Sequence, residues 1–176
     1  MIFVFKILIF LFLILIVGCT QQDFEEVIKE APKEPLSDNL GKEAFDQAYS
    51  GTVLAGKTTI YLEFNKADYD LAVTENKIIL LYFYADWCPI CKEEQVRVYE
   101  AFNEMDYNNV VGFRVNYRDS GVDEFEEELA KEYGITYQHT KVIIKDGQRI
   151  LKAPDSWEKE RYLEEISKLI WKKKIK

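Results

Sequence analysis

Residues 82–92 read YFYADWCPICK, an apolar run that delivers two cysteines to what we expect to be the first turn of a helix. Cys88 follows the run, and Cys91 comes three residues later. Unpaired amides and the positive end of a helix favour negative charge, and the thiolate is the reactive form of cysteine. The pattern therefore predicts a reactive thiol at Cys88, with Cys91 close enough to close a disulfide behind it.

The cysteine and histidine content narrows the chemistry of this pair. The chain has three cysteines and a single histidine, His139. A closed structural zinc site needs a second pair of ligands at matching spacing, which these residues do not supply. A disulfide over so short a loop removes little entropy from the unfolded chain, so a purely structural bridge is the weaker interpretation. Cys88 and Cys91 therefore indicate redox chemistry or metal binding.

The third cysteine, Cys19, ends a segment typical of export signals. Residues 1–18 contain Lys6, an apolar run over residues 7–17 and a glycine directly before Cys19. The run is shorter than the roughly 20 apolar residues of a membrane-spanning helix, but it suits the apolar core of a signal peptide. An uncleaved signal anchor is the alternative. Both interpretations place the domain outside the cytoplasm on a membrane tether.

Residues 16–19, IVGC, resemble the lipobox of prokaryotic lipoproteins, in which the signal is cut before a cysteine that carries a diacylglycerol. This resemblance implies that Cys19 is lipidated and that the chain is an extracytoplasmic lipoprotein. The polar, proline-containing stretch that follows is typical of a flexible spacer. We expect four parts: a signal peptide at 1–18, a tether at 19–37, an N-terminal extension at 38–58 and a globular domain at 59–176.

Composition fits one compact domain and argues against nucleic acid as a partner. The 176 residues are 48% hydrophobic, which is enough for a single core, and the formal net charge is −8. Binding to phosphates needs a clustered basic face, which this acidic chain does not indicate. The lysines at 172–174 are expected at a solvated helix end, with contact to anionic lipid as the alternative.

Hydrophobic periodicity predicts a mixed α/β order. Pro89 suits the first position of a helix, and Asp146-Gly147 suits the two-residue turn of a hairpin. The expected strands cover 59–64, 78–85, 110–116, 141–145 and 149–152, and the expected helices cover 65–75, 89–105, 123–133 and a final segment opened by a capping box at 155–158.

Two details of the expected helices concern which side chains face the core. In the helix at 89–105, Val96, Tyr99 and Phe102 have the spacing of a core stripe. In the helix at 123–133, the four glutamates between 124 and 128 are most simply a solvated face. Both interpretations rest on apolar residues marking the buried side.

This element order, together with ADWCPICK at 85–92, resembles the thioredoxin family. The segments YGI at 133–135 and KDG at 145–147 match later landmarks of that family, so the resemblance covers about residues 59–171. It implies a thioredoxin-like α/β fold with a central mixed sheet and helices on both faces. It also implies thiol–disulfide exchange on protein substrates with no required cofactor. Because no histidine lies between the cysteines, we expect a reductant more than an oxidant.

The resemblance also implies a role for each residue of the motif. Cys88 would attack a substrate disulfide as the thiolate, and Cys91 would resolve the mixed disulfide. Trp87 would flank the reactive sulfur on the docking surface, although an ordinary packed aromatic is the alternative. Pro89 and Ile90 would tune the reduction potential through the helix end.

Two positions depart from the family pattern. The buried aspartate that manages the proton of the second cysteine corresponds here to Tyr82, and a phenol with a pKa near 10 is a poor base. The proton of Cys91 would then leave to water or to a carboxylate that the sequence does not identify. The proline that faces the cysteines corresponds to His139, followed by Thr140. We expect Gln138 and His139 to contact the substrate or the sulfurs.

His139-Thr140 before a strand also resembles the Sco family of copper chaperones, in which two cysteines and such a histidine bind copper. Thiolates and imidazole suit copper, although the cysteines here are separated by two residues and not three. The competing hypothesis is therefore a copper-binding assembly factor that uses Cys88, Cys91 and His139. Alternatively, His139 fills the space of the proline and tunes the redox pair. A non-redox interaction module is the third hypothesis.

Overall fold

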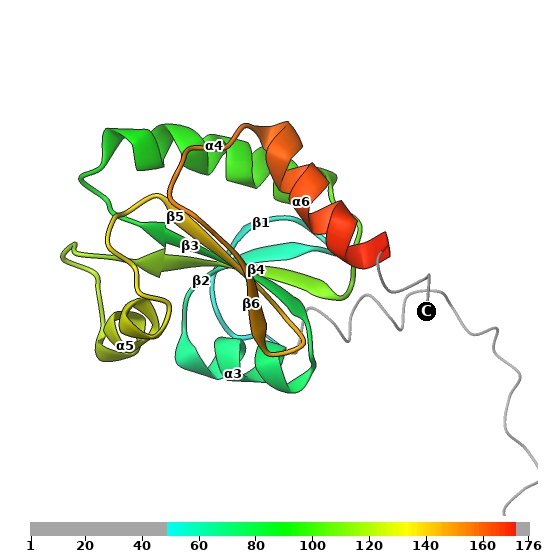
Figure 1. Ribbon diagram of the computed structural model, residues 1–176, viewed down its shortest axis with the longest axis horizontal. Helices are drawn as coiled ribbons and strands as arrows, with labels where there is room; N and C mark the ends of the chain where they lie inside the picture. The colour runs from blue at the N-terminus through cyan, green and yellow to red at the C-terminus, as the bar shows by residue number, and fades with distance from the viewer. Residues whose placement is uncertain (1–48, 172–176) are drawn as a thin grey trace, which may run out of the picture. The chain divides into compact units, whose positions relative to one another are not determined.

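The computed structural model describes residues 49–171 (Figure 1). The expected signal peptide, the tether, Cys19, residues 38–48 and the lysines at 172–174 lie outside the described residues. Within residues 49–171, no helix is long and apolar enough to cross a membrane. The elements are β1 Val53–Ala55, β2 Ile60–Glu63, α3 Lys66–Thr74, β3 Ile78–Tyr84, α4 Pro89–Glu104, β4 Val110–Asn116, α5 Glu124–Glu132, β5 Thr140–Lys145, β6 Gln148–Ala153 and α6 Lys159–Trp171.

The strands form one mixed sheet in the order β1-β2-β4-β3-β5-β6. Strands β2 and β3 both run parallel to β4, whereas β5 is antiparallel to β3 and β6 is antiparallel to β5. Helices α4 and α6 cover one face of this sheet, and α3 and α5 lie against the other (Figure 1). The expected α/β fold, a mixed sheet with helices on both faces, is confirmed.

Strand β3 forms the centre of the core because both of its faces are apolar. All seven of its residues are buried, as a near-continuous apolar run predicts for a strand that is covered on both sides. Leu80, Tyr82 and Tyr84 join the core cluster with residues of α4 and α6. Ile79 and Phe83 join the cluster with residues of α3 and α5. The strand thus leads from the middle of the molecule directly into the cysteine motif.

Strand β1 lies inside the segment that was expected to be an N-terminal extension. It pairs antiparallel with β2, where Val53 faces Leu62. Just before it, the Ser50 and Gly51 amides donate to the Asp68 carboxylate at 2.9 and 2.8 Å. Three residues are too few to show a period-two pattern, so this strand could not be predicted from the hydrophobic pattern.

The buried face of α4 differs from the expected stripe. The buried residues of α4 are Cys91, Glu94, Val98, Ala101 and Phe102, whereas Val96 is 56% exposed. The prediction for Val96 is wrong because a charged residue, Glu94, occupies the apolar face. A prediction from apolar residues alone therefore placed Val96 on the buried face of α4 and left Glu94 off it.

Two other expectations about helix surfaces are corrected. Glu126 is buried and not solvated, because its carboxylate accepts from the backbone amides of Asn116 and Asp123 at 2.7 and 3.0 Å. Helix α6 begins at Lys159, so the expected capping box at 155–158 does not open it. That segment is held instead by tertiary contacts, among them a hydrogen bond from the Trp157 amide to Glu94.

The hairpin between β5 and β6 agrees with the sequence. Asp146 and Gly147 have φ values of 50° and 68°, as a two-residue turn of this kind requires. Asn and Asp tolerate a positive φ better than most residues, and Gly adopts it without strain. The turn joins β5 to β6 and brings Lys145 opposite Gln148 at the start of their antiparallel pairing.

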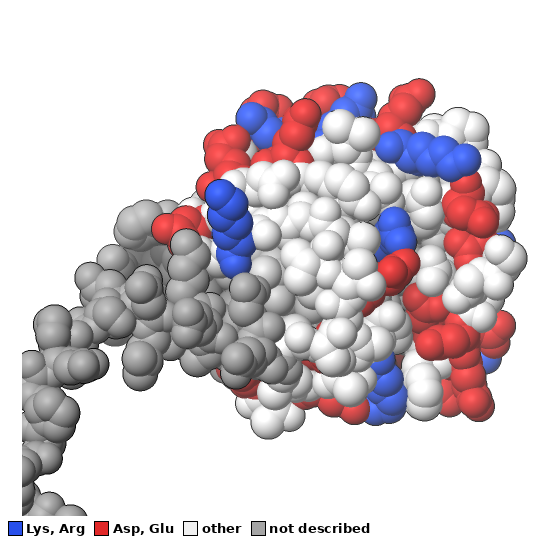
Figure 2. All heavy atoms as spheres, turned by 180° about the vertical axis from the view of Figure 1, so that it is seen from behind, with Lys and Arg blue, Asp and Glu red and all other residues white. Residues whose placement is uncertain are grey.

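The surface carries charges of both signs. On the face drawn in Figure 2, acidic and basic side chains surround an uncharged centre, with no continuous basic surface among the residues shown in colour.

Candidate functional site

The two cysteines lie at the start of α4, where β3 ends. Cys88 is the N-cap of α4, and its Sγ accepts a hydrogen bond from the Cys91 amide at 3.2 Å. Pro89 occupies the first turn, as its lack of an amide hydrogen allows. Both cysteines are free thiols; Cys88 is 2% exposed and Cys91 is fully buried. The backbone therefore directs an amide of the first helical turn, which has no partner within the helix, at the sulfur of Cys88.

The Cys91 thiol is held in its protonated form. The pKa of Cys91 is raised to about 12, first by burial and then by the hydrogen bond with the Cys88 side chain, while a hydrogen bond with the Tyr82 side chain acts in the opposite direction. A thiol with this pKa is almost entirely neutral near pH 7. Cys91 must therefore lose a proton before it can act as a nucleophile.

Tyr82 links the second cysteine to a buried carboxylate. Its hydroxyl lies 3.4 Å from the Cys91 carbonyl oxygen and 3.3 Å from Oε2 of Glu94. Burial raises the pKa of Tyr82 well above its usual value, so the phenol itself is a donor and not a base. Glu94 is the carboxylate near Cys91 that the sequence did not identify.

Glu94 belongs to a buried ion pair with Lys141. Both side chains are fully buried, and Oε1 of Glu94 lies 2.6 Å from the Lys141 ammonium. The same oxygen accepts from the Trp157 amide and the Tyr162 hydroxyl, each at 2.7 Å. Burial lowers the pKa of Lys141, while Glu94 raises it. The pair thus connects α4, β5 and the segment before α6 behind the cysteines.

Two features of the sequence could have revealed this pair, although neither residue was predicted to belong to the site. Glu94 lies three residues after Cys91 and four before Val98, so helical spacing places it on the buried face of α4. Lys141 lies two residues before Ile143 in β5, so both project from the same face of that strand. The register confirms the placement, because Lys141 lies directly opposite Tyr82.

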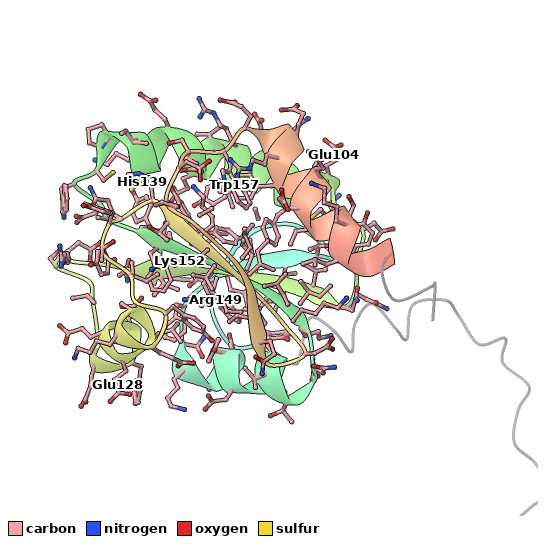
Figure 3. All side chains as sticks on the ribbon, viewed as in Figure 1. Glu104, Glu128, His139, Arg149, Lys152 and Trp157 are labelled. Atoms are coloured by element: carbon pink, nitrogen blue, oxygen red, sulfur yellow. The ribbon has the colours of Figure 1, made fainter. Side chains whose placement is uncertain are left out.

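His139 faces the cysteines from the loop before β5. One ligand atom from each of Cys88, Cys91 and His139 can be chosen so that all three lie within 4.8 Å of one another. His139 has a φ of 52°, and its carbonyl oxygen accepts from the Lys141 ammonium at 2.8 Å. Figure 3 shows His139 at the end of β5 nearest to the start of α4. The structure therefore brings together the three residues that the sequence proposed as one site.

The rim of the site is apolar and exposed. Trp87, Ile90 and Tyr137 are 54%, 48% and 64% exposed. Trp87 is held by a hydrogen bond from its indole nitrogen to the Arg118 carbonyl oxygen at 2.9 Å. An aromatic side chain that is both exposed and oriented is typical of a binding surface more than of core packing. We call Trp87, Ile90 and Tyr137 the apolar rim.

The remaining predicted site residues are placed as follows. Gln138 is half-buried, and Thr140 is buried with its hydroxyl donating to the Tyr137 carbonyl oxygen at 2.8 Å. Pro89 is exposed beside the rim. The Thr140 side chain therefore stabilises the loop that carries His139 by its hydrogen bond to the Tyr137 carbonyl oxygen.

A dithiol at the start of a helix, directly after the central strand of such a sheet, defines a class of redox protein. The thioredoxin family matches residues 60–171, and the chain belongs to that family. It is 37% identical over 90 residues to Thioredoxin-T of Drosophila melanogaster, covering 50% of this chain and 53% of that protein. It is 32% identical over 97 residues to Putative thioredoxin 2 of Streptomyces coelicolor, covering 54% of this chain and 66% of the relative.

These relatives match over only part of their own length, between about half and two thirds. Among solved structures, a mutant thioredoxin from Halobacterium salinarum is 22% identical, with a TM-score of 0.50, and the match covers 65% of this chain and 93% of that one. At this identity the likeness supports the fold alone. Fold and family therefore agree with the geometry of the cysteine pair.

Proposed function

We propose that the chain is an extracytoplasmic, membrane-anchored thiol–disulfide oxidoreductase that reduces protein disulfides through Cys88 and Cys91. The observation that carries this proposal is the position of the Cys88 sulfur as the cap of α4, where it accepts the Cys91 amide at 3.2 Å. Cys91 lies directly behind it, as the resolving thiol must. The family of the chain supports redox chemistry at this pair.

The reaction passes two electrons from the cysteine pair to the substrate. The Cys88 thiolate attacks one sulfur of a substrate disulfide, so that a mixed disulfide forms and the other substrate sulfur leaves as a thiolate. Cys91 then attacks the Cys88 sulfur and releases the second substrate thiolate. The pair ends as a disulfide, and the substrate ends as a dithiol. The electron donor that restores the pair is a separate partner.

The second step needs a route for the Cys91 proton. Tyr82 lies between the Cys91 side chain and the Glu94 carboxylate, and its hydroxyl lies 3.3 Å from Oε2 of Glu94. We infer that the Cys91 proton passes to the substrate thiolate released in the first step, while the Tyr82 hydroxyl, positioned by Glu94, stabilises the Cys91 thiolate that forms. Glu94, acting through Tyr82, would thereby take the role of the buried aspartate that the thioredoxin family carries at the position of Tyr82.

The apolar rim gives the substrate a place to dock. Trp87 directly precedes Cys88, Ile90 lies between the two cysteines, and Tyr137 lies two residues before His139, so all three expose apolar surface on the segments that form the site. Contacts to these side chains fit an unfolded or extended protein segment with apolar residues next to its disulfide. Gln138, which is half-buried in the same loop, would offer the polar contact.

The membrane anchor is a proposal that rests on residues 1–19 alone. The apolar run, the preceding lysine and the lipobox-like IVGC support lipidation at Cys19. A signal anchor is the alternative. A chain with Cys19→Ala that still partitions with membranes and loses no lipid mass would contradict lipidation and support the uncleaved anchor.

Two cysteine variants test the exchange mechanism. Cys88→Ser removes the nucleophile, so reduction of a disulfide-bonded protein substrate should stop. Cys91→Ser leaves the first step intact and blocks the second, so a mixed disulfide with the substrate should accumulate. Non-reducing electrophoresis and mass spectrometry measure both results. Unchanged reductase activity in Cys88→Ser would show that the proposed nucleophile is wrong.

Copper binding by Cys88, Cys91 and His139 is the second candidate function. The proximity of one sulfur or nitrogen from each residue, all within 4.8 Å, favours it. Thiolate and imidazole are ligands that copper accepts readily. Tight binding of Cu(I) to the reduced chain, lost on replacement of His139, is the expected result.

A further inference from the structure

Three segments of the chain meet at the edge of the sheet where the cysteines lie. Strands β3 and β4 run parallel and end together, with Tyr84 opposite Asn116, so the segments that follow them are neighbours. Strand β5 is antiparallel to β3, so the loop that precedes β5 reaches the same edge. The residues after β4 therefore belong to the surface that a disulfide substrate meets, together with the cysteine motif and the loop of His139.

A pocket of about 400 Å³ opens between the segment after β4 and the end of α5. Its buried lining includes the apolar residues Tyr117, Ala130 and Ile135. The Tyr117 hydroxyl donates to the Ile135 carbonyl oxygen at 3.0 Å, which joins the two walls of the pocket. Two exposed basic residues, Arg118 and Lys131, also line it. The pocket thus combines a buried apolar lining with exposed cations.

Arg118 differs from the other arginines in having no polar partner. Among residues 49–171, every other arginine side chain forms an ion pair or a hydrogen bond, namely Arg97, Arg114, Arg149 and Arg161. The Arg118 guanidinium lies 5.0 Å from the centre of the Tyr117 ring and makes no hydrogen bond or ion pair within the same residues. Its N–H donors are available to a ligand, and their planar arrangement matches a carboxylate.

The charged groups next to Arg118 already have other partners. The Lys131 ammonium lies 3.6 Å from the Glu127 carboxylate on the same helix. Asp119 follows Arg118 directly, but its carboxylate accepts from two backbone amides at 3.2 and 3.0 Å. Arg118 is therefore the cation at this pocket that remains available to a negatively charged ligand.

The backbone of Arg118 is fixed to the cysteine motif. Its carbonyl oxygen accepts from the Trp87 indole nitrogen at 2.9 Å, and Trp87 directly precedes Cys88. Arg118 has a φ of 54°, a conformation that most residues other than glycine avoid. A strained residue that its surroundings hold in place beside a reactive group is typical of a functional position.

We propose that Arg118 recognises a carboxylate of the substrate, so that the protein prefers disulfides flanked by Asp or Glu. This inference deepens the proposed exchange function and rests on it. A substrate segment whose cysteine is bonded to Cys88 would pass Trp87 and place an acidic side chain on the guanidinium, with apolar atoms of the segment in the pocket. The formal net charge of −8 disfavours an acidic segment elsewhere, so Arg118 would also fix the register of the segment.

The experiment compares synthetic disulfide-bonded peptides that differ only in the residues flanking one cysteine, which are Glu, Gln or Lys. Each peptide is mixed with the reduced full chain, and the rate of the first turnover is measured after an acid quench. Each rate is divided by that of the same peptide with dithiothreitol, which corrects for the effect of the charge on the disulfide itself.

The wild type should reduce the Glu peptide up to roughly fivefold faster than the Gln peptide, the gain that an ion pair open to solvent provides. The Lys peptide should react most slowly. Because salt screens exposed charges, the preference for the Glu peptide should shrink as the ionic strength rises.

Variants of Arg118 separate its charge from its place in the loop. Arg118→Asn removes the cation and tolerates the positive φ, so the Glu and Gln peptides should then react at the same rate. Arg118→Lys keeps the charge without the planar donors and should retain part of the preference. Lys57→Gln, in the turn between β1 and β2 at the opposite edge of the sheet, also removes one positive charge. This matched control should keep the wild-type preference.

The outcomes distinguish this inference from the exchange function. Equal rates for the Glu and Gln peptides in the wild type, or an unchanged preference in Arg118→Asn, would overturn the inference while the exchange function stands. Failure of the wild type to reduce any of the peptides would contradict the exchange function, and the inference would fall with it.

Discussion

Glu94 and Glu126 are both buried glutamates on helices, but they lie on opposite faces of the sheet and meet different partners. Glu94 on α4 is paired with the Lys141 ammonium at 2.6 Å and also accepts from Tyr162. Glu126 on α5 accepts from the backbone amides of Asn116 and Asp123. One carboxylate is therefore matched by a full charge, and the other only by dipoles.

The difference shows in the titration of Glu126. Burial raises the pKa of Glu126 to about 7, although its two amide hydrogen bonds act in the opposite direction. Glu94 lies in a network whose members are all buried, and loss of its carboxylate would leave the Lys141 ammonium without a counter-charge. The face with the cysteines is thus built on a charge pair, while the opposite face contains a group that responds to pH near neutrality.

The largest expected effect comes from breaking the buried ion pair. Glu94→Gln keeps the volume of the side chain but leaves the Lys141 ammonium without its counter-charge, so the free energy of unfolding should fall by about 3–5 kcal/mol. Equilibrium urea unfolding of the reduced chain measures this change. The loss should be smaller at high pH, where the lysine, whose pKa burial lowers, becomes neutral more readily.

A double variant separates the charge from the packing. Adding Lys141→Met to Glu94→Gln removes the unpaired cation, and the stability should recover by at least half of the loss. If the double variant were as unstable as Glu94→Gln alone, the pair would matter for shape and not for charge. Glu94 and Glu126 would then not differ in the way proposed, because the full charge of Lys141 would contribute no more to stability than the backbone dipoles around Glu126 do.

The same two glutamates show what the sequence could predict. The apolar run of β3 and the following CPIC at 88–91 predicted the central strand, the helix start and the place of both cysteines, because these depend on neighbours in the chain. The burial of Glu94 depends on Lys141, which reaches it only through the pairing of β3 with β5. Glu126 is buried because it closes a capping box with Asp123 and also binds the end of β4. The Lys141 partner of Glu94 and the β4 partner of Glu126 come from other elements of the fold, so composition and periodicity did not predict the burial of either glutamate. The capping box of Glu126 with Asp123 is local, and its spacing is the one signal in the sequence that could have marked Glu126.

A smaller effect is expected from the titration of Glu126. Its pKa is raised in the folded state, so the folded chain holds the proton more tightly than the unfolded chain does. The stabilising contribution is present in full below about pH 4.5 and is lost as the pH rises through about 7, by an amount on the order of 2–3 kcal/mol. Urea unfolding at a series of pH values measures it.

The control for this prediction is Glu126→Gln, which cannot titrate. The difference in stability between wild type and variant should change with pH only between about 4.5 and 7, since other groups contribute equally to both chains. A difference that stays constant across this range would mean that Glu126 is already charged at low pH. The two buried carboxylates would then be alike in their protonation.

The smallest expected effect on stability comes from Tyr82→Phe, which removes one hydroxyl and keeps the ring. That hydroxyl donates a hydrogen bond to Glu94, and its hydrogen bond with Cys91 lowers the pKa of that thiol. Its loss should lower the free energy of unfolding by about 1 kcal/mol. It should also slow resolution of the mixed disulfide, because the pKa of Cys91 rises further when the hydrogen bond from Tyr82 is gone. Stopped-flow measurement of substrate release against pH tests this, with Tyr84→Phe as the matched control. Resolution at the wild-type rate across the pH range would show that the ion pair of Glu94 only supports the fold and does not reach the cysteines.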